Sequence, residues 1–240
     1  YFLISKSKIV MDFLQRSYIE SRNRPVSFLK KIIEGKKRFG YLLLVLTLAP
    51  MIRIMSLVLP LSNFSQIFWF VLTGVAIYLS FIVLKIQQKI KLEECGIKLP
   101  KLKHLPIEIG IILLGIPFGL TEYYILKPDP IIQFFTLKNF LITFLIFLLS
   151  ISLVEEIVFR GILQKRSIDI LGKWKGLFFV SLVFAALHIG NLSFLDFVFV
   201  FLIGLLYAII VYNTKTIIGV TISHTVVNMF LFLICPLTLA

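Results

Sequence analysis

The chain has 240 residues, of which 59% are hydrophobic and 15% are charged, and its mean hydropathy is +0.99. Water-soluble domains of this length do not normally reach such values, so the composition predicts an integral membrane protein in contact with membrane lipid. The formal net charge of +13 raises the question of a nucleic-acid partner, but the basic residues gather in alternate segments between apolar runs, which indicates membrane topology and excludes a nucleic-acid patch.

Residues 1–38 mix Lys, Arg and Ser with apolar side chains such as Phe2, Ile9 and Phe28. This pattern is typical of a basic helix lying on an anionic leaflet, and it fits a solvated, partly disordered tail equally well. We therefore predict a basic cytoplasmic segment over 1–38, either an amphipathic surface helix or a solvated tail, and a membrane domain over 39–240.

The membrane domain is predicted to be all-α, with about seven transmembrane helices that enclose a polar intramembrane cavity. Several apolar runs approach the roughly 20 residues that cross a bilayer as a helix, and the alternating pattern of a membrane β-barrel is absent. We place the spans at 39–59, 64–84, 106–126, 134–160, 175–189, 193–213 and 216–235.

The basic residues also predict the orientation of the chain. Of the 25 Lys and Arg, 22 lie before Phe39, between Lys85 and Lys103, between Arg160 and Lys175, or at Lys215. Because positive charge is retained on the cytoplasmic side, this order puts the N-terminus in the cytoplasm and the C-terminus outside.

Two adjacent carboxylates and an arginine interrupt the apolar run LVEEIVFRG, which extends from Leu153 to Gly161. A charged side chain at the bilayer centre costs about 2.5–3.5 kcal/mol even on mild insertion scales, so such residues usually mark a functional site. Glu156 and Arg160 share a helix face at i,i+4, whereas Glu155 points about 100° away. The pattern fits a catalytic Glu155 organised by the Glu156–Arg160 pair, and it also fits a pair that only holds two helices together.

Two further polar positions follow at similar depth. Phe184 and His188 share one face of span five, and His224 and Asn228 share one face of span seven. Together the three spans supply a base (Glu155), a partner that shares a water with it (His188), and two hydrogen-bond donors for an oxyanion (His224 and Asn228). This set is suited to peptide hydrolysis without a covalent intermediate.

Other chemistry is less well supported. Two His and a carboxylate make a three-ligand zinc site possible in principle, but no HExxH motif occurs and the ligands lie on three helices, so we expect no metal or other cofactor. Ser152, Ser181 and Ser223 lack a GxSxG motif. A proton-coupled transporter would normally show repeated broken helices, which we do not find.

Three acidic residues near predicted span ends are expected to be solvated at the interface: Glu108, Glu122 and Asp196.

Span counting raises one geometric difficulty. It places Glu155 near the cytoplasmic end of span four and His188 near the outer end of span five. Their contact therefore requires tilted helices, a later end of span four, or a membrane-embedded 161–175 segment.

The three motifs resemble those of the type II CAAX prenyl endopeptidases, also described as CAAX proteases and bacteriocin-processing enzymes, or the Abi family. The motifs are Glu155-Glu156-x-x-x-Arg160, Phe184-x-x-x-His188 and His224-x-x-x-Asn228, in the family's order, and the resemblance covers about 110–235. It implies an intramembrane glutamate-dependent endopeptidase, with Glu155 and His188 activating water and with His224 and Asn228 as the oxyanion hole.

The resemblance leaves the substrate open. Members of this family act on prenylated CAAX tails or are linked to peptide maturation and bacteriocin immunity, so a lipidated protein or a membrane-associated peptide is the expected partner. A non-catalytic immunity or peptide-binding protein on the same scaffold is the alternative. The short, Lys- and Ile-rich chain favours a bacterial plasma-membrane member.

Overall fold

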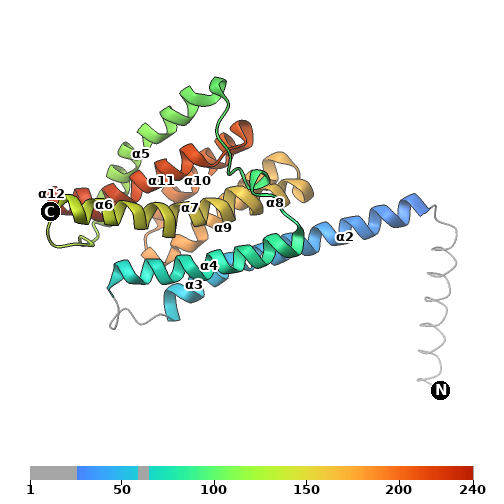
Figure 1. The fold of residues 1–240 in the computed structure, drawn as a ribbon, viewed down its shortest axis with the longest axis horizontal. Helices are drawn as coiled ribbons and strands as arrows, with labels where there is room; N and C mark the ends of the chain where they lie inside the picture. Colours follow the sequence, from blue (N-terminus) through green and yellow to red (C-terminus); the bar gives the residue numbers. More distant parts are fainter. Residues whose placement is uncertain (1–25, 59–64, 240) are drawn as a thin grey trace, which may run out of the picture. The chain divides into compact units, whose positions relative to one another are not determined.

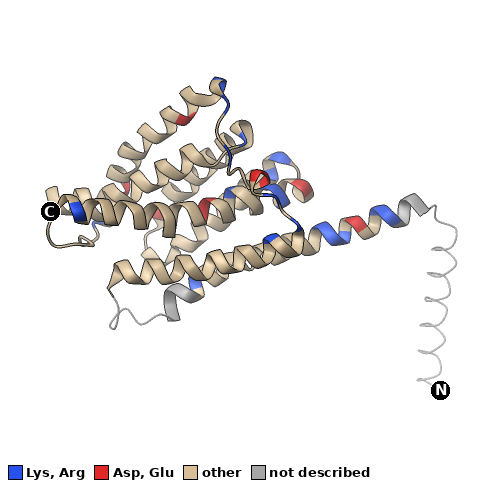
Figure 2. Ribbon diagram, viewed as in Figure 1, with Lys and Arg blue, Asp and Glu red and all other residues tan. Residues whose placement is uncertain are grey.

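A computed structural model describes residues 26–58 and 65–239. The chain divides into two compact units, Tyr1–Gly40 and Tyr41–Ala240. The predicted surface helix before residue 26 lies outside the described residues. In the described part of the first unit, the basic residues lie on helix α2 (Val26–Leu46), from Lys30 to Arg38, with Glu34 among them (Figure 2).

The second unit is all-α in its described residues, which confirms the predicted fold class. Six helices of the described chain are long and apolar enough to cross a membrane. The first predicted span, 39–59, corresponds to the end of α2 and to α3 (Leu48–Val58), and it is not among these six. The number of seven spans is therefore not confirmed.

The candidate spans run in chain order through the second unit (Figure 1). They are α4 (Gln66–Gln88), α5 (Leu105–Leu126) with a short 3₁₀ turn before it, a long helix over Leu137–Leu171, α9 (Lys173–Ala186) with a 3₁₀ turn to Asn191, α10 (Phe194–Thr214), and α11 (Ile218–Met229) continuing to Thr238. 

Local sequence signals explain where these helices begin and end. The hydroxyls of Ser65, Thr136 and Ser193 each accept a hydrogen bond from a backbone N–H of the first helical turn, in α4, in the long helix and in α10 respectively. Pro106 stands in the first turn of α5, where its missing N–H costs nothing. Gly172, at φ 81°, ends the long helix.

The long helix contains two wider, π-helical stretches. It consists of α6 (Leu137–Ile146), η4 (Phe147–Ser152), α7 (Leu153–Glu156), η5 (Ile157–Leu163) and α8 (Gln164–Leu171). The predicted end at residue 160 is wrong. Arg160 is buried inside the unit, so its charge does not mark the edge of the span, and Glu155 lies near the middle of this helix.

Helix α5 packs closely on α11 through two glycines. A Cβ added to Gly115 would lie 2.7 Å from the carbonyl oxygen of Ser223, and one added to Gly119 would lie 2.7 Å from that of Val227. Small residues of this kind allow membrane helices to approach backbone to backbone. The helix that carries His224 and Asn228 is therefore held against α5.

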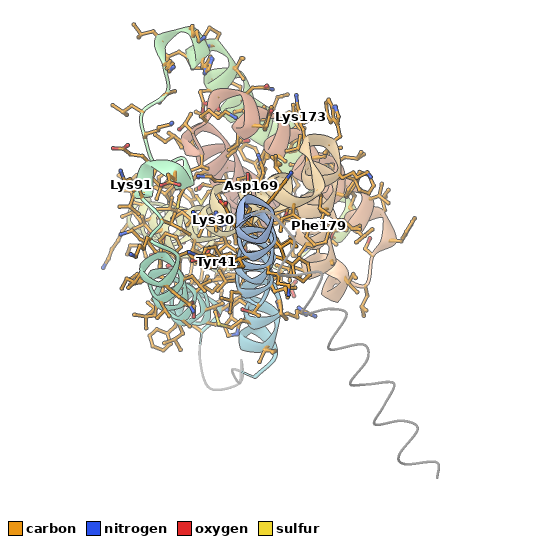
Figure 3. All side chains as sticks on the ribbon, turned by 90° about the vertical axis from the view of Figure 1, so that its right-hand side faces the viewer. Lys30, Tyr41, Lys91, Asp169, Lys173 and Phe179 are labelled. Atoms are coloured by element: carbon orange, nitrogen blue, oxygen red, sulfur yellow. The ribbon has the colours of Figure 1, made fainter. Side chains whose placement is uncertain are left out.

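Large apolar side chains of the outer helix faces remain exposed. On α4, Leu79, Val83 and Ile86 are 60–71% exposed, as expected for positions that contact lipid rather than protein. Figure 2 shows that most of α4 carries no charge, whereas charged positions gather around α8 and the connector after α4. Figure 3 looks onto this end of the helices, with Lys91, Asp169 and Lys173 labelled.

Candidate functional site

The expected ion pair on the long helix is present and completely buried. Arg160 Nη1 donates to Glu156 Oε1 at 3.0 Å, and Arg160 Nη2 donates to the carbonyl oxygen of Gly204 at 3.3 Å. The guanidinium also lies 4.1 Å from the centre of the Phe184 ring. Burying a charge without such partners would be very costly, so α7, α9 and α10 together hold this arginine.

His224 of α11 lies between the two glutamates. Its Nδ1 is 3.0 Å from Glu156 Oε1, and its Nε2 is 3.9 Å from Glu155 Oε2. A carboxylate can only accept, so Nδ1–H donates to Glu156, and this bond fixes the orientation of the ring. The sequence grouped His224 with Asn228 alone, and its contact with Glu156 was missed.

His188 stands on the 3₁₀ turn that follows α9, η6 (Leu187–Asn191). Its Nδ1 lies 3.3 Å from the carbonyl oxygen of Phe184. When Nδ1–H donates to this carbonyl, Nε2 is the nitrogen left to contact a water. The Phe184 ring neighbours both imidazoles, with its centre 5.2 Å from that of His188 and 6.0 Å from that of His224.

The predicted neighbours Glu155 and His188 are not joined directly. Across the described chain, no hydrogen bond or ion pair links the two side chains, and Glu155 instead lies beside His224. Span four runs over Leu137–Leu171, so Glu155 lies near the middle of this span and not at its cytoplasmic end, where span counting placed it. Any cooperation of Glu155 with His188 thus requires a molecule between them.

A small cavity brings the two histidines and Asn228 together. Its volume is about 30 Å³, enough for a water molecule. Its lining includes three side chains that the sequence predicted as catalytic, His188, His224 and Asn228. It also includes Glu122, Phe184 and Tyr207.

Asn228 has an unused donor in this site. Its Nδ2 is buried, and none of the described residues accepts a hydrogen bond from it. Buried polar groups are normally satisfied, so an orphaned donor beside a water-sized cavity indicates a position for a ligand oxygen.

Glu122 of α5 is the site residue that the sequence reasoning missed. The expectation of interfacial solvation is wrong for Glu108, Glu122 and Asp196, which are 3%, 6% and 0% exposed. Glu108 accepts from the Gly219 N–H at 2.8 Å and Asp196 accepts from Asn191 Nδ2 at 2.9 Å, whereas Glu122 lines the cavity. The signal that would have found Glu122 is its spacing of three residues after Gly119, on the close-packed face of α5.

A second, larger cavity has a volume of about 370 Å³ and is lined in part by Arg160. Most of the rest of its lining comes from α8, from α10 and from the connector that joins α4 to α5. Glu94 of this connector accepts a hydrogen bond from Lys165 at 2.6 Å, and this bond lowers the pKa of the Glu94 carboxyl. The adjacent Cys95 is packed against Gly161, and burial raises the pKa of its thiol to about 11. The connector therefore packs against the part of the long helix that contains Gly161 and Lys165.

The serines and a possible metal site add little to this picture. Ser223 accepts from the Tyr207 hydroxyl at 2.8 Å, and Ser181 donates to the carbonyl oxygen of Leu177. Within the residues that the structure describes, no three His, Cys, Asp or Glu side chains are grouped to hold a metal ion. The absence of a cofactor stays a prediction.

A comparison with protein families confirms the resemblance over part of the chain. Residues 136–230 match the model of the family described as type II CAAX prenyl endopeptidase Rce1-like. All seven residues named in the three motifs lie within this range, and Glu122 lies outside it. No curated protein and no solved structure matches the chain.

Proposed function

We propose that the protein is an intramembrane endopeptidase that hydrolyses a peptide bond of a membrane-associated or lipidated substrate. The observation that carries the proposal is the water-sized cavity with two histidines and an unpartnered Asn228 donor. The two histidines and Asn228 lie within a segment that matches an endopeptidase family.

In this proposal Glu155 is the base and His188 positions the water. The cavity holds the water, and His188 Nε2 contacts it there. Glu155 does not line this cavity but lies 3.9 Å from His224 Nε2, and it takes a proton of the water once the substrate is bound, as the oxygen attacks the peptide carbonyl carbon. Because no direct bond joins the two side chains, the water and the substrate are the link between them.

The carbonyl oxygen becomes an oxyanion after this attack. Asn228 Nδ2–H and a protonated Nε2 of His224 are the proposed donors, and one such donor typically contributes about 2.7–4 kcal/mol to catalysis. Glu156 orients His224 through Nδ1, and Arg160 holds Glu156 in place. Glu156 and Arg160 are thus positioning residues.

The surroundings of the site also suggest a class of substrate and a cellular location. A polar site within apolar helices is accessible to a peptide that is itself in the membrane, such as a lipidated tail. We propose a multi-pass protein of a bacterial plasma membrane, with its N-terminus in the cytoplasm and its C-terminus outside, that acts without a cofactor.

The competing function is non-catalytic. On the same scaffold, the cavity would hold part of a peptide in a bacteriocin-immunity or peptide-binding protein, and Glu155 would have no reaction to serve. A zinc peptidase and a proton-coupled transporter are the remaining alternatives.

Comparative proteomics of membrane-associated peptides separates these functions. Cells carrying the wild type are compared with cells carrying Glu155→Gln, and Glu93→Gln, a change at an exposed glutamate, is the control. The proposal expects products that disappear with Glu155→Gln only and that persist after chelator treatment. Identical products for the two variants would contradict the proposal, and loss of products with a chelator would favour zinc.

A further inference from the structure

Glu122 is directed at the cavity by the packing of its helix. The buried face of α5 includes Glu108, Gly115, Gly119 and Glu122. The two glycines bring this face against α11, which carries His224 and Asn228. Glu122 follows Gly119 by three residues, so its side chain projects from the same face into the cavity that the two histidines line.

The Glu122 carboxyl has no partner within the described chain. No hydrogen bond or ion pair of the described residues reaches it, although it is only 6% exposed. The titratable groups around it are His188 and His224 across the cavity, and Tyr207 and Asp196 on α10. Glu108, by contrast, is occupied by the Gly219 N–H. An unpartnered carboxyl in an apolar interior costs far less in its neutral form than as a carboxylate.

Peptide hydrolysis needs such a group. One residue must take a proton from the attacking water, and the leaving amine nitrogen must receive a proton when the C–N bond breaks. Glu122 on α5 lines the cavity, whereas Glu155 on α7 lies beside His224 and near the Arg160 guanidinium. Carboxyl pairs in such unequal surroundings commonly divide the roles of base and acid.

We propose that Glu122 is a further catalytic residue, the acid that protonates the leaving amine. This assignment rests on the proposed endopeptidase function. Water attacks the carbonyl carbon as Glu155 takes its proton. The C–N bond then breaks, its electron pair stays on nitrogen, and that nitrogen takes the Glu122 proton. Transfer of the proton from Glu155 to Glu122 through a water completes the cycle without any other reactant.

The assignment is tested with two forms of one substrate. The purified protein in liposomes receives a quenched fluorescent peptide with an S-farnesyl cysteine, containing either an amide or a thioester at the scissile position. A thiolate leaves without a proton, because the pKa of a thiol is only about 8.5, whereas the amine requires one. Glu122→Gln keeps the shape of the side chain and removes its transferable proton.

The expected result is a selective loss. Glu122→Gln lowers kcat for the amide at least about 100-fold with little change in KM, and it lowers kcat for the thioester less than about 10-fold. Glu122→Asp restores part of the amide activity. Glu108→Gln, the matched change on the same helix, leaves both reactions within about threefold of the wild type. Glu155→Gln abolishes cleavage of both forms, because both need an activated water.

Two results would overturn the role of Glu122 alone. Unchanged amide cleavage by Glu122→Gln, or an equal loss with both forms, would each exclude an acid that serves the leaving group. If Glu122→Gln does not accumulate as folded protein, Glu122→Met is used in its place, because Met also has no proton to give. We expect the same selective loss of amide cleavage from Glu122→Met. A wild type that cleaves neither form, or an active Glu155→Gln, would instead overturn the proposed function and this assignment with it.

Discussion

Two ion pairs of the chain have the same spacing and nearly the same length, but very different surroundings. Glu34 and Arg38 on α2 are 3.1 Å apart, and Glu156 and Arg160 on the long helix are 3.0 Å apart, both at i,i+4. The side chains of the first pair are more than half exposed, whereas those of the second are 0–1% exposed. Spacing alone therefore does not distinguish a surface pair from a site.

A third pair shows that distance does not distinguish them either. Lys165 and Glu94 are 2.6 Å apart, closer than the other two pairs, and their side chains are about 40% exposed. What sets Glu156–Arg160 apart is a third partner, His224, on a helix that is distant in sequence. Substitutions at each pair and in the cavity test whether burial and this partner decide the function of the pair.

The largest effect on stability is expected for Arg160→Met. The change leaves Glu156 buried without its cation, which typically costs about 3–5 kcal/mol. We expect a clearly lower unfolding temperature in detergent and loss of cleavage. A variant as stable as the wild type would show that the arginine does not compensate the Glu156 charge.

Asn228→Ala should affect the reaction more than the fold. Loss of one oxyanion donor typically lowers kcat by about 10²–10³-fold, and the removed Nδ2 has no partner in the described chain to lose. Asn213→Ala is the control, since this amide is exposed and donates to its own helix at Ile209. Equal kcat values for the two variants, from cleavage of the amide peptide, would remove Asn228 from the site.

The Glu94–Lys165 pair should make a small, pH-dependent contribution. Lys165 lowers the pKa of Glu94 below its ordinary value of 4.5, so the pair stabilises the folded state above that value. The contribution is lost as the pH falls through the lowered pKa, and it is about 0.2–1 kcal/mol for so exposed a pair. Lys165→Met should therefore lower the unfolding temperature slightly at pH 7, and the difference from the wild type should shrink as the pH falls below 4.5. A difference that does not shrink with falling pH would have another cause.

The smallest effect is expected for Arg38→Met, the counterpart of Arg160→Met. Exposed i,i+4 pairs contribute only about 0.3–0.5 kcal/mol. Unfolding temperature and cleavage should both stay close to those of the wild type. A loss comparable to that of Arg160→Met would break the contrast on which this account rests.

The sequence predicted those features that depend on one helix at a time. Hydropathy predicted the membrane helices, and i,i+4 spacing predicted the Glu156–Arg160 pair and the shared face of His224 and Asn228. These are local properties of a helix, so a single sequence contains them.

Contacts between helices could not be predicted in the same way. The contact of His224 with Glu156 depends on how α11 lies against α7. The end of the long helix was misplaced because Arg160 was read as a loop charge, although Glu156 and the Gly204 carbonyl neutralise it inside the unit. The burial of Glu122 depends on the close packing of α5 and α11 at Gly115 and Gly119.

The central claim is that the buried carboxylates serve a reaction, and cleavage by Glu155→Gln tests it most directly. The variant and the wild type are reconstituted at equal amounts and given the amide peptide, with folding checked by their unfolding temperatures. We expect a folded variant without detectable cleavage, beside an active Glu93→Gln control. Cleavage by folded Glu155→Gln at the wild-type rate would contradict it.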